Sequence, residues 1–316
     1  MKIFLKIALI FAIGTALAQP YPSKPIRMVV AFPPGGPVDI IARLLAPKLQ
    51  DMLGQPVVVE NRAGAGGNVP TSQVAKASPD GYTVLAHSSA YAVNPSLTPN
   101  AGYDPEKDFL PVSVVASQPN LIIVHANFPA KSLAELLQMA RTSQLAYASP
   151  SSGTTPHLTA ENLFRVRAQV DITHVPFKGG GPATAAVLGG QPPIGSMAAG
   201  GPMSNLRAGK LRALAVSSSR RLASLPDVPT LGELGFHGME DYTWVGLFVP
   251  AGTPAEIVQR LNSVVLQAVR SPDVRERLEA LAFEPTAAPL RETADYVRAE
   301  LVKWAKVVRD TGAKLD

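Results

Sequence analysis

Hydrophobic positions along the chain form short apolar runs that alternate with longer stretches of helical spacing. Apolar runs bounded by Gly, Pro or Asp predict buried strands, and they lie at 26–32, 57–59, 83–86, 121–124, 145–148 and 211–216. Between them, apolar residues recur every three or four positions, which predicts amphipathic helices. The order of these elements predicts an α/β fold with mainly parallel sheets that are covered by helices on both faces.

Helix-start signals sharpen this pattern. Ser132 and Glu135 have the spacing of a capping box, in which side chains satisfy free backbone N–H groups, and residues 253–256 open a later helix. Pro47 lies inside the first helical pattern and predicts a kink. A last helix carries Trp304 on its apolar face, where we expect core packing.

The N-terminus has the layout of a secretory signal. Lys2 and Lys6 flank an apolar run over 7–13, and Ala16-Leu17-Ala18 follows, which predicts cleavage between Ala18 and Gln19. The run is shorter than the roughly 20 apolar residues that span a membrane, and no Cys follows the cleavage point. We therefore expect a periplasmic protein with a signal peptide over residues 1–18.

Composition narrows the class further. The chain has no Cys, which excludes disulfides and thiolate metal sites. Charged residues make up 17% of the chain, and no block of Lys and Arg stands out, so we expect no nucleic-acid partner. The length predicts two lobes, with crossings near 117–120 and 239–244: lobe 1 is formed by 19–119 and 244–316, and lobe 2 by 120–243. We expect a monomer.

Catalytic and cofactor signatures are missing. There is no G-x-S-x-G elbow and no Walker A sequence, and the glycines at 64–67 lack the third glycine of a dinucleotide turn. The five histidines are dispersed without the short spacing of metal ligands. Glu240 and Asp241 point to opposite sides of any regular element and are predicted to be solvated. We expect no catalytic residue, metal or cofactor.

Four predicted strands instead run into loops of Gly, Ser and Thr that open helices. Glycine lets a ligand approach the backbone, hydroxyls donate hydrogen bonds, and helix N-termini offer free N–H groups. One such loop is typical of an ordinary βα turn, but four in an exported chain favour a site for an anion. Asp39 is predicted to cap its helix rather than to contact the anion. The loops lie at 32–39, 86–90, 148–157 and 175–183.

Over essentially all of its length after the signal, the chain resembles the Bug/TctC family, the extracytoplasmic receptors of tripartite tricarboxylate transporters. The resemblance rests on ordered blocks such as Tyr-Pro-Ser-Lys-Pro-Ile-Arg (21–27), Pro-Gly-Gly-x-x-Asp (34–39), Thr-Pro-His-Leu (155–158) and His-Val-Pro-Phe-Lys-Gly-Gly (174–180). Further matching blocks lie at 54–68, 79–83, 103–105, 207–216, 225–230 and 250–254.

The resemblance implies a type II periplasmic-binding-protein fold, two lobes with a ligand cleft between them. It implies that a carboxylate is held by backbone N–H groups, small hydroxyls and ordered waters. Met197 stands where the family usually has an acid, so we expect a ligand without an amino group. The implied ligand contacts are Gly35, Gly36, Val38, Asp39, Ser88, Ser89, Ser149, Ser152, Gly153, Thr154, Phe177, Lys178 and Met197.

Three functions follow as hypotheses. The first is a solute-binding protein that closes on a small carboxylate and delivers it to membrane permease subunits. The second is a ligand sensor that docks on the ectodomain of a histidine kinase. The third is a periplasmic hydrolase or lyase, for which Ser152 and His157 are the nearest nucleophile–base pair in sequence.

Overall fold

The structure is a computed structural model that describes residues 21–98 and 100–314. The predicted signal peptide lies outside these residues. Ten strands join in the order β2-β1-β3-β9-β4-β7-β5-β6, with β8 and β10 also paired to β4. The strands are β1 (Ile26–Val30), β2 (Val57–Asn61), β3 (Thr83–Ser88), β4 (Phe109–His125), β5 (Leu145–Ser149), β6 (Ile172–Pro176), β7 (Ile194–Ala198), β8 (Leu211–Val216), β9 (Tyr242–Pro250) and β10 (Glu284–Pro285).

Helices cover both faces of the strands. They are α1 (Pro37–Leu53), η1 (Ala65–Gly67), α2 (Asn68–Ala75), α3 (Ala90–Leu97), α4 (Leu133–Ala140), α5 (Thr155–Glu161), η2 (Asn162–Arg167), α6 (Gly180–Leu188), α7 (Met203–Arg207), α8 (Ala255–Arg270), α9 (Pro272–Ala280) and α10 (Leu290–Thr311). No helix in the described part of the chain is long and apolar enough to cross a membrane.

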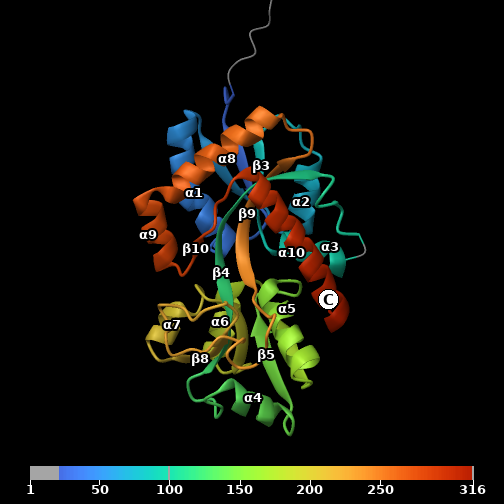
Figure 1. The fold of residues 1–316 in the computed structure, drawn as a ribbon, viewed down its shortest axis with the longest axis vertical. Coiled ribbons are helices and arrows are strands. Elements are labelled where there is room, and N and C mark those ends of the chain that lie inside the picture. The colour runs from blue at the N-terminus through green and yellow to red at the C-terminus, as the bar shows by residue number, and fades with distance from the viewer. Residues whose placement is uncertain (1–20, 99, 315–316) are drawn as a thin grey trace, which may run out of the picture.

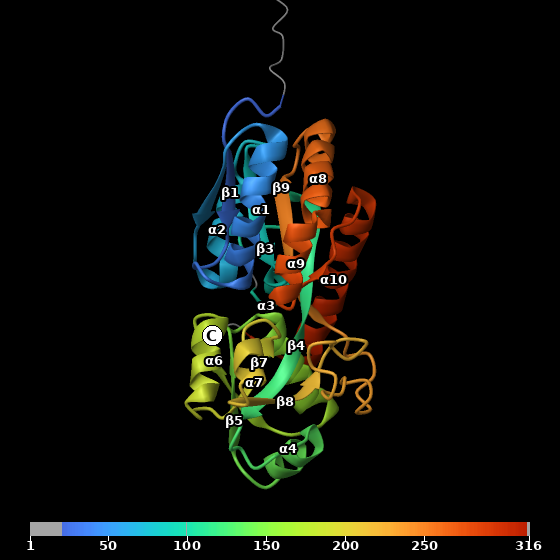
Figure 2. The same cartoon turned by 90° about the vertical axis from the view of Figure 1, so that its left-hand side faces the viewer.

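The long strand β4 belongs to two sheets. Its first part, Phe109 to Pro119, pairs with β9, and its second part, Asn120 to His125, pairs with β7 and β8. We call residues 21–119 and 242–314 the upper half and residues 120–241 the lower half, as they stand in Figure 1. Figure 2 shows β4 running from one half into the other. The fold is thus the two-lobed α/β architecture that the sequence predicts.

The strands are less uniformly parallel than predicted. β1 is parallel to β2 and β3, and β5 is parallel to β6 and β7. β9 is antiparallel to both β3 and β4, and β7 and β8 are antiparallel to β4. The reason is topological: β4 leaves the upper half and β9 returns to it, so adjacent crossing strands run in opposite directions.

Strand pairing places the functional loops. Pro119 pairs with Tyr242 and Ser88 pairs with Val245, so the carboxyl end of β3 lies beside the point where the chain crosses between the halves. Asn120 pairs with Ala198, so the carboxyl end of β7 lies at the same level in the lower half. Because β1 and β2 run parallel to β3, and β5 and β6 run parallel to β7, every loop that follows these strands points to the junction.

Each sheet has an apolar core on both faces. Met28 and Val30 belong to one cluster of the upper half, whereas Val29 and Ala31 belong to the cluster on the other face. In the lower half, Ile122 and Leu121 separate in the same way. This alternation of side chains along a strand confirms that helices cover both faces.

Local predictions are mostly confirmed. Ser132 accepts a hydrogen bond from the N–H of Glu135 (3.2 Å) at the start of α4, and Trp304 is buried in the core. α1 continues from Pro37 to Leu53 with Pro47 inside it. α8 begins at Ala255, but its N-cap is Pro254, because the hydroxyl of Thr253 donates to the carbonyl of Pro250 (2.7 Å).

Candidate functional site

The four Gly/Ser/Thr loops converge on the junction between the halves. The hydroxyl of Ser89, on the loop after β3, lies 3.1 Å from the hydroxyl of Thr155, the first residue of α5. Both residues are buried. The N-termini of α1, α5 and α6 carry no side-chain cap, so their first N–H groups have no partner within the helix or from a capping side chain.

The first loop is organised by Asp39. Its carboxylate accepts hydrogen bonds from the N–H of Gly35 (2.9 Å), the Nδ2 of Asn61 (2.8 Å) and the Nε of Arg43 (2.9 Å). Burial raises the pKa of the carboxyl, but these donors together hold the pKa of Asp39 below its ordinary value. The N-cap of α1 is Gly36. The prediction that Asp39 caps the helix is therefore wrong: it lies three residues after the cap, and its carboxylate instead fixes the loop before α1 through the N–H of Gly35.

This geometry divides the predicted contacts of the first loop. The N–H of Gly35 is taken up by Asp39. Gly36 opens the helix, and a Cβ on it would meet only the carbonyl of Pro33, at 3.8 Å. Val38 is buried in the apolar core of the upper half. Gly35 is exposed and Gly36 is half-buried, so the backbone of these two glycines is the part of the loop that a ligand could approach.

The second loop carries Ser88 and Ser89 after the buried His87. The hydroxyl of Ser88 accepts from the N–H of Ala90 (3.2 Å), while the N–H of Ser89 donates to the carbonyl of Trp244 (2.9 Å). The Nδ1 of His87 lies 2.9 Å from the carbonyl of Ser88. Burial lowers the pKa of His87 to about 4, so this ring is neutral at neutral pH.

We predict that replacing Gly67 with alanine destabilises the protein by at least about 2 kcal/mol. Gly67 has a φ of +99°, and a Cβ there would lie 2.4 Å from the Nε2 of His87, which is held in the second loop. Urea unfolding followed by circular dichroism measures the loss. Gly209→Ala is the matched control, since its φ of +67° is also positive but nothing lies within 4 Å of a Cβ there. Equal losses in the two variants would contradict the predicted collision.

Two histidines contact the third loop through hydrogen bonds. The hydroxyl of Ser149 lies 2.7 Å from the Nε2 of His174, and the N–H of Gly153 donates to the Nδ1 of His157 (3.2 Å). The two rings stack with centroids 4.0 Å apart. Burial, followed by the charges of His174 and Arg165, lowers the pKa of His157 to about 3. A neutral His157 therefore serves as an acceptor for the backbone of the loop.

The remaining predicted residues of this loop surround those contacts. Ser152 is buried, and Thr154 is half-buried and donates its hydroxyl hydrogen to the carbonyl of Ser151 (2.8 Å). The sequence pattern did not reveal the role of His157 and His174, because 17 positions separate residues that only the parallel pairing of β5 and β6 brings together.

The fourth loop is tied to the third. The N–H of Phe177 donates to the carbonyl of Ser149 (3.0 Å), and that of Gly179 donates to the carbonyl of Pro150 (2.7 Å). Lys178 is exposed and forms no ion pair within 4 Å in the described part of the chain. A Cβ on Gly180, the first residue of α6, would meet nothing within 4 Å. The N-terminus of α6 thus lies open.

Met197 and Ser196 point to opposite faces of β7. Met197 is 1% exposed and belongs to the apolar cluster that contains Leu121 and Ala148, with Phe177 packed against it. The hydroxyl of Ser196 donates to the carbonyl of Pro156 (2.6 Å). Neither side chain carries charge, and direct contact of Met197 with a ligand stays a prediction.

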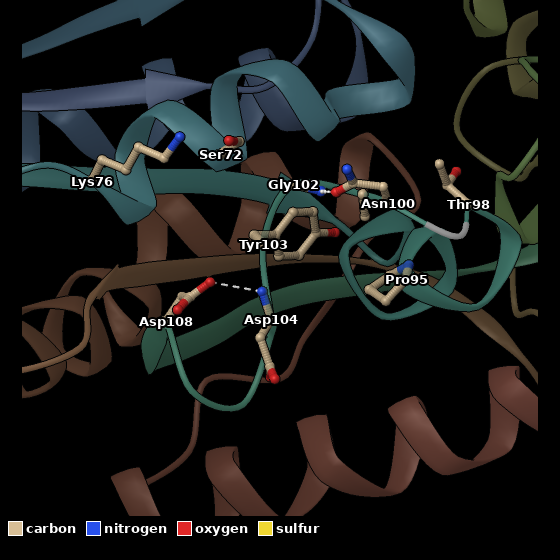
Figure 3. Close-up of a pocket in the computed structure, with 10 residues that line it drawn as sticks. Ser72, Lys76, Pro95, Thr98, Asn100, Gly102, Tyr103, Asp104 and Asp108 are labelled. Atoms are coloured by element: carbon tan, nitrogen blue, oxygen red, sulfur yellow. Dashed lines mark hydrogen bonds between the residues drawn. The ribbon is translucent and has the colours of Figure 1, made fainter.

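A separate hollow lies on the upper half. It has a volume of about 610 Å³, and Figure 3 shows the hydrogen bonds of its rim, from the N–H of Asp104 to Asp108 (2.7 Å) and from the N–H of Gly102 to Asn100 (3.2 Å). None of the thirteen predicted ligand contacts lines it. Among the described residues, no group of three or more His, Asp or Glu side chains could hold a metal ion. The hollow is lined by Ser72, Lys76, Pro95, Thr98, Asn100, Ala101, Gly102, Tyr103, Asp104 and Asp108.

Comparisons with known proteins agree with this architecture. Residues 41–313 match the family described as tripartite tricarboxylate transporter family receptor. The chain is 41% identical over 304 residues to protein BugT of Bordetella pertussis, an alignment that covers 94% of this chain and 92% of that protein.

Solved structures are similar over nearly the whole chain. One is Rpa4515 of R. palustris with adipate, which is 34% identical with a TM-score of 0.87 and covers 94% of this chain and 100% of that one. Another is MatC from Rhodopseudomonas palustris with bound malate, which is 34% identical with a TM-score of 0.83 and covers 91% of this chain and 100% of that one.

Proposed function

This chain belongs to the tripartite tricarboxylate transporter receptor family, and on that premise we propose that it captures a small dicarboxylate between its two halves. Membership of the family makes it a solute-binding receptor. The finer points are our proposals: the chemical class of the ligand, the residues that hold it, and delivery to membrane permease subunits. Rpa4515 with adipate and MatC with malate support a dicarboxylate, since both molecules carry two carboxylates on a short chain.

One observation carries the proposal: uncapped helix N-termini from both halves meet at one junction. α1 comes from the upper half, and α5 and α6 come from the lower half. Free N–H groups and the positive ends of helix dipoles favour anions at such ends. A ligand with two carboxylates could bridge the halves and stabilise their closed arrangement through contacts that an open arrangement lacks.

The charges around the junction support a ligand without an amino group. An ammonium group needs an unengaged carboxylate beside it, and the carboxylate of Asp39 is already neutralised by Arg43 and two neutral donors. The position of Met197 offers no acid. We therefore place simple dicarboxylates ahead of amino acids.

A hydrolase remains the second candidate because Ser149 and His174 lie 2.7 Å apart, within the reach that a nucleophile–base pair requires. Ser149 is 0% exposed, however, and its hydroxyl also lies 3.2 Å from the carbonyl of Ser151. A nucleophile needs access to its substrate, so we propose that this chain is not an enzyme. Ester and lactone substrates that are turned over by the wild type and not by Ser149→Ala would reverse this assignment.

We predict that calorimetry with malate, adipate, succinate, glutamate and neutral diamides detects binding only to the dicarboxylates that lack an amino group. Gly180→Ala should weaken that binding at least about tenfold, because a methyl group would stand at the open N-terminus of α6. Its thermal stability should stay unchanged, since Gly180 lacks a positive φ and its Cβ meets no atom.

Gly189→Ala, at the other end of α6, is the matched control and should bind like the wild type. Binding to the neutral diamides alone would contradict the proposed ligand class. Unchanged binding by Gly180→Ala would remove α6 from the site. A histidine-kinase ectodomain and the permease subunits would both recognise the liganded protein. Which of the two co-purifies with it therefore distinguishes a sensor from a transport receptor.

A further inference from the structure

A buried polar cluster lies where the chain crosses between the halves. One member is an acid and the others are neutral, and they come from both crossing segments, from α5 and from the residue after β8. Figure 1 shows β4, β9 and α5 meeting at this level. We call it the hinge cluster: Asn120, Thr155, Thr159, Ser217, Asp241 and Thr243, each at most 7% exposed. The burial of Asp241 overturns the prediction that this acid is solvated, whereas its neighbour Glu240 is exposed.

Two short contacts of Thr159 point to a protonated Asp241. The hydroxyl of Thr159 lies 2.7 Å from the carbonyl of Thr155 and 2.8 Å from the Oδ2 of Asp241. A hydroxyl has one hydrogen, and the carbonyl can only accept. Both contacts are hydrogen bonds at once if Thr159 donates to the carbonyl and a protonated Oδ2 of Asp241 donates to Thr159.

The other partners of Asp241 agree with this arrangement. The Nδ2 of Asn120 donates to the Oδ1 of Asp241 (2.6 Å) and to the hydroxyl of Thr159 (3.1 Å). The hydroxyl of Ser217 donates to the main-chain carbonyl of Asp241 (2.6 Å), so its hydrogen is not available to the carboxyl group. A carboxylate here would have few donors to stabilise its charge.

The orientation of Asn120 then sets the direction of a chain of hydroxyls. Since its Nδ2 faces Asp241, its Oδ1 accepts from Thr243 (2.9 Å). Thr243 has no second hydrogen, so Thr155 donates to it across 2.7 Å. Ser89 must in turn donate to Thr155 across 3.1 Å. The hydroxyl of Ser89, a predicted ligand contact, is therefore a donor to the hinge cluster, and it joins the upper half to α5.

Charged and titratable groups lie near Asp241 on α10 and β9. The Nζ of Lys303 donates to the carbonyl of Glu240 (2.9 Å) and to the Oε1 of Glu300 (3.3 Å), and Tyr296 and Tyr242 stand nearby. From β4, α5 and Ser217 come only neutral groups. Burial raises the pKa of Asp241 to about 6, although Lys303 and the hydrogen bonds act in the opposite direction.

We propose that Asp241, as a neutral carboxylic acid, is a positioning residue that holds the two halves closed through the hinge cluster. When Asp241 ionises, Thr159 turns its hydrogen from the carbonyl of Thr155 to the carboxylate. The first turn of α5 then loses a bond, and the link from Thr155 to Ser89 weakens. This proposal rests on the proposed function in one respect: closure of the two halves is what captures the ligand.

The direction of the pH effect follows from the raised pKa. A buried acid whose pKa lies above its ordinary value favours the closed form while it is protonated. That contribution is complete below about pH 4 and is lost as the pH rises through about 6. The closed fraction of the ligand-free protein should therefore fall between these values and stay level above pH 7.

Two introduced cysteines can report closure without any ligand, because the chain has no cysteine of its own. Gln144→Cys and Gln259→Cys are exposed positions in the lower half and on α8, and a donor and an acceptor dye on them give an energy-transfer efficiency from pH 4.5 to 8. We expect the efficiency to fall as the pH rises from 4.5 to about 6 and to stay level above pH 7. Asp241→Asn should keep the high value throughout, and Asp227→Asn, at an exposed acid, should behave like the parent.

Several results would overturn the proposal. One is an unchanged pH step in Asp241→Asn, and another is an Asp241→Asn protein that is as open at pH 5 as the parent at pH 7.5. If Asp241→Asn does not fold, Thr159→Val tests the same bond, because it should open the protein at pH 5. A Thr159→Val protein that stays closed at pH 5 would contradict the proposal. Carbon-13 resonances of labelled aspartate in the parent must include a carboxyl that titrates near pH 6. Because no ligand is present, these outcomes are independent of the calorimetry above.

Discussion

Replacing Glu300 with leucine is expected to lower the free energy of unfolding by about 3–5 kcal/mol. The Oε2 of Glu300 accepts hydrogen bonds from the indole N–H of Trp244 (2.9 Å) and of Trp304 (2.8 Å), and Lys303 lies 3.3 Å from its Oε1. Both tryptophans are at most 1% exposed. Leucine would leave two buried N–H groups without an acceptor, and the ammonium of Lys303 would keep only the carbonyl of Glu240.

Tryptophan emission reports this site directly, because the chain contains only two tryptophans and both donate to Glu300. Guanidinium unfolding followed by emission and by circular dichroism gives the free energy, and the two signals should coincide. Glu300→Gln keeps an acceptor oxygen and should lose only about 1–2 kcal/mol. A Glu300→Leu protein as stable as Glu300→Gln would show that the shared acceptor contributes little.

Replacing Asp39 with alanine is expected to cost about 2–4 kcal/mol of stability and to abolish measurable dicarboxylate binding. The change removes the acceptor of the Gly35 N–H and one of the two acceptors of the Asn61 amide, and it leaves Arg43 beside a buried gap. The loop that leads into α1 would then lose its fixed conformation. Unfolding in urea and calorimetry with malate measure the two effects.

Acid should reproduce part of this loss. Since the pKa of Asp39 is below its ordinary value of 3.8, the stability that it provides is present above that value and is lost as the pH falls through the lower folded pKa. Asp39→Ala should therefore lose less stability than the wild type between pH 4 and pH 2. Asp227→Ala, at an exposed acid, is the matched control. Full malate binding by Asp39→Ala would remove this carboxylate from the organisation of the site.

Much of the fold was predictable because its apolar periods are long and clear. The run at 83–86 is buried throughout, so its composition alone identifies a strand, whereas the run at 57–59 lies in the edge strand β2, where Val58 is 48% exposed. β4 was harder. Its apolar end at 121–124 was evident, but Pro111 and Gln118 lie in the same strand and interrupt the apolar pattern of its first part. Because β4 is buried along nearly its whole length, its polar and apolar residues do not alternate in the way that marks a half-exposed strand.

The site was predictable only where the chemistry is local. The loops that contain Gly36, Ser88 and Gly153 can be proposed as ligand contacts from a few consecutive residues. Asp241 does not, because its burial depends on Asn120 and Thr159, which are 121 and 82 positions away. Partners from distant segments leave no trace in the neighbouring sequence, and an acid followed by an aromatic residue is typical of a solvated turn.

The shared strand β4 also constrains how such receptors exchange parts. Because one unbroken strand runs through both sheets, a cut between Pro119 and Asn120 divides β4, whose first part stays paired with β9 in the upper half and whose second part stays paired with β7 in the lower half. A chimaera that grafts a new specificity must therefore transplant residues 120–241 as one block, with both seams inside the paired strands. The donor and recipient proteins would need matching partners for Asn120 and Asp241, so both ends of the block have to be transferred together.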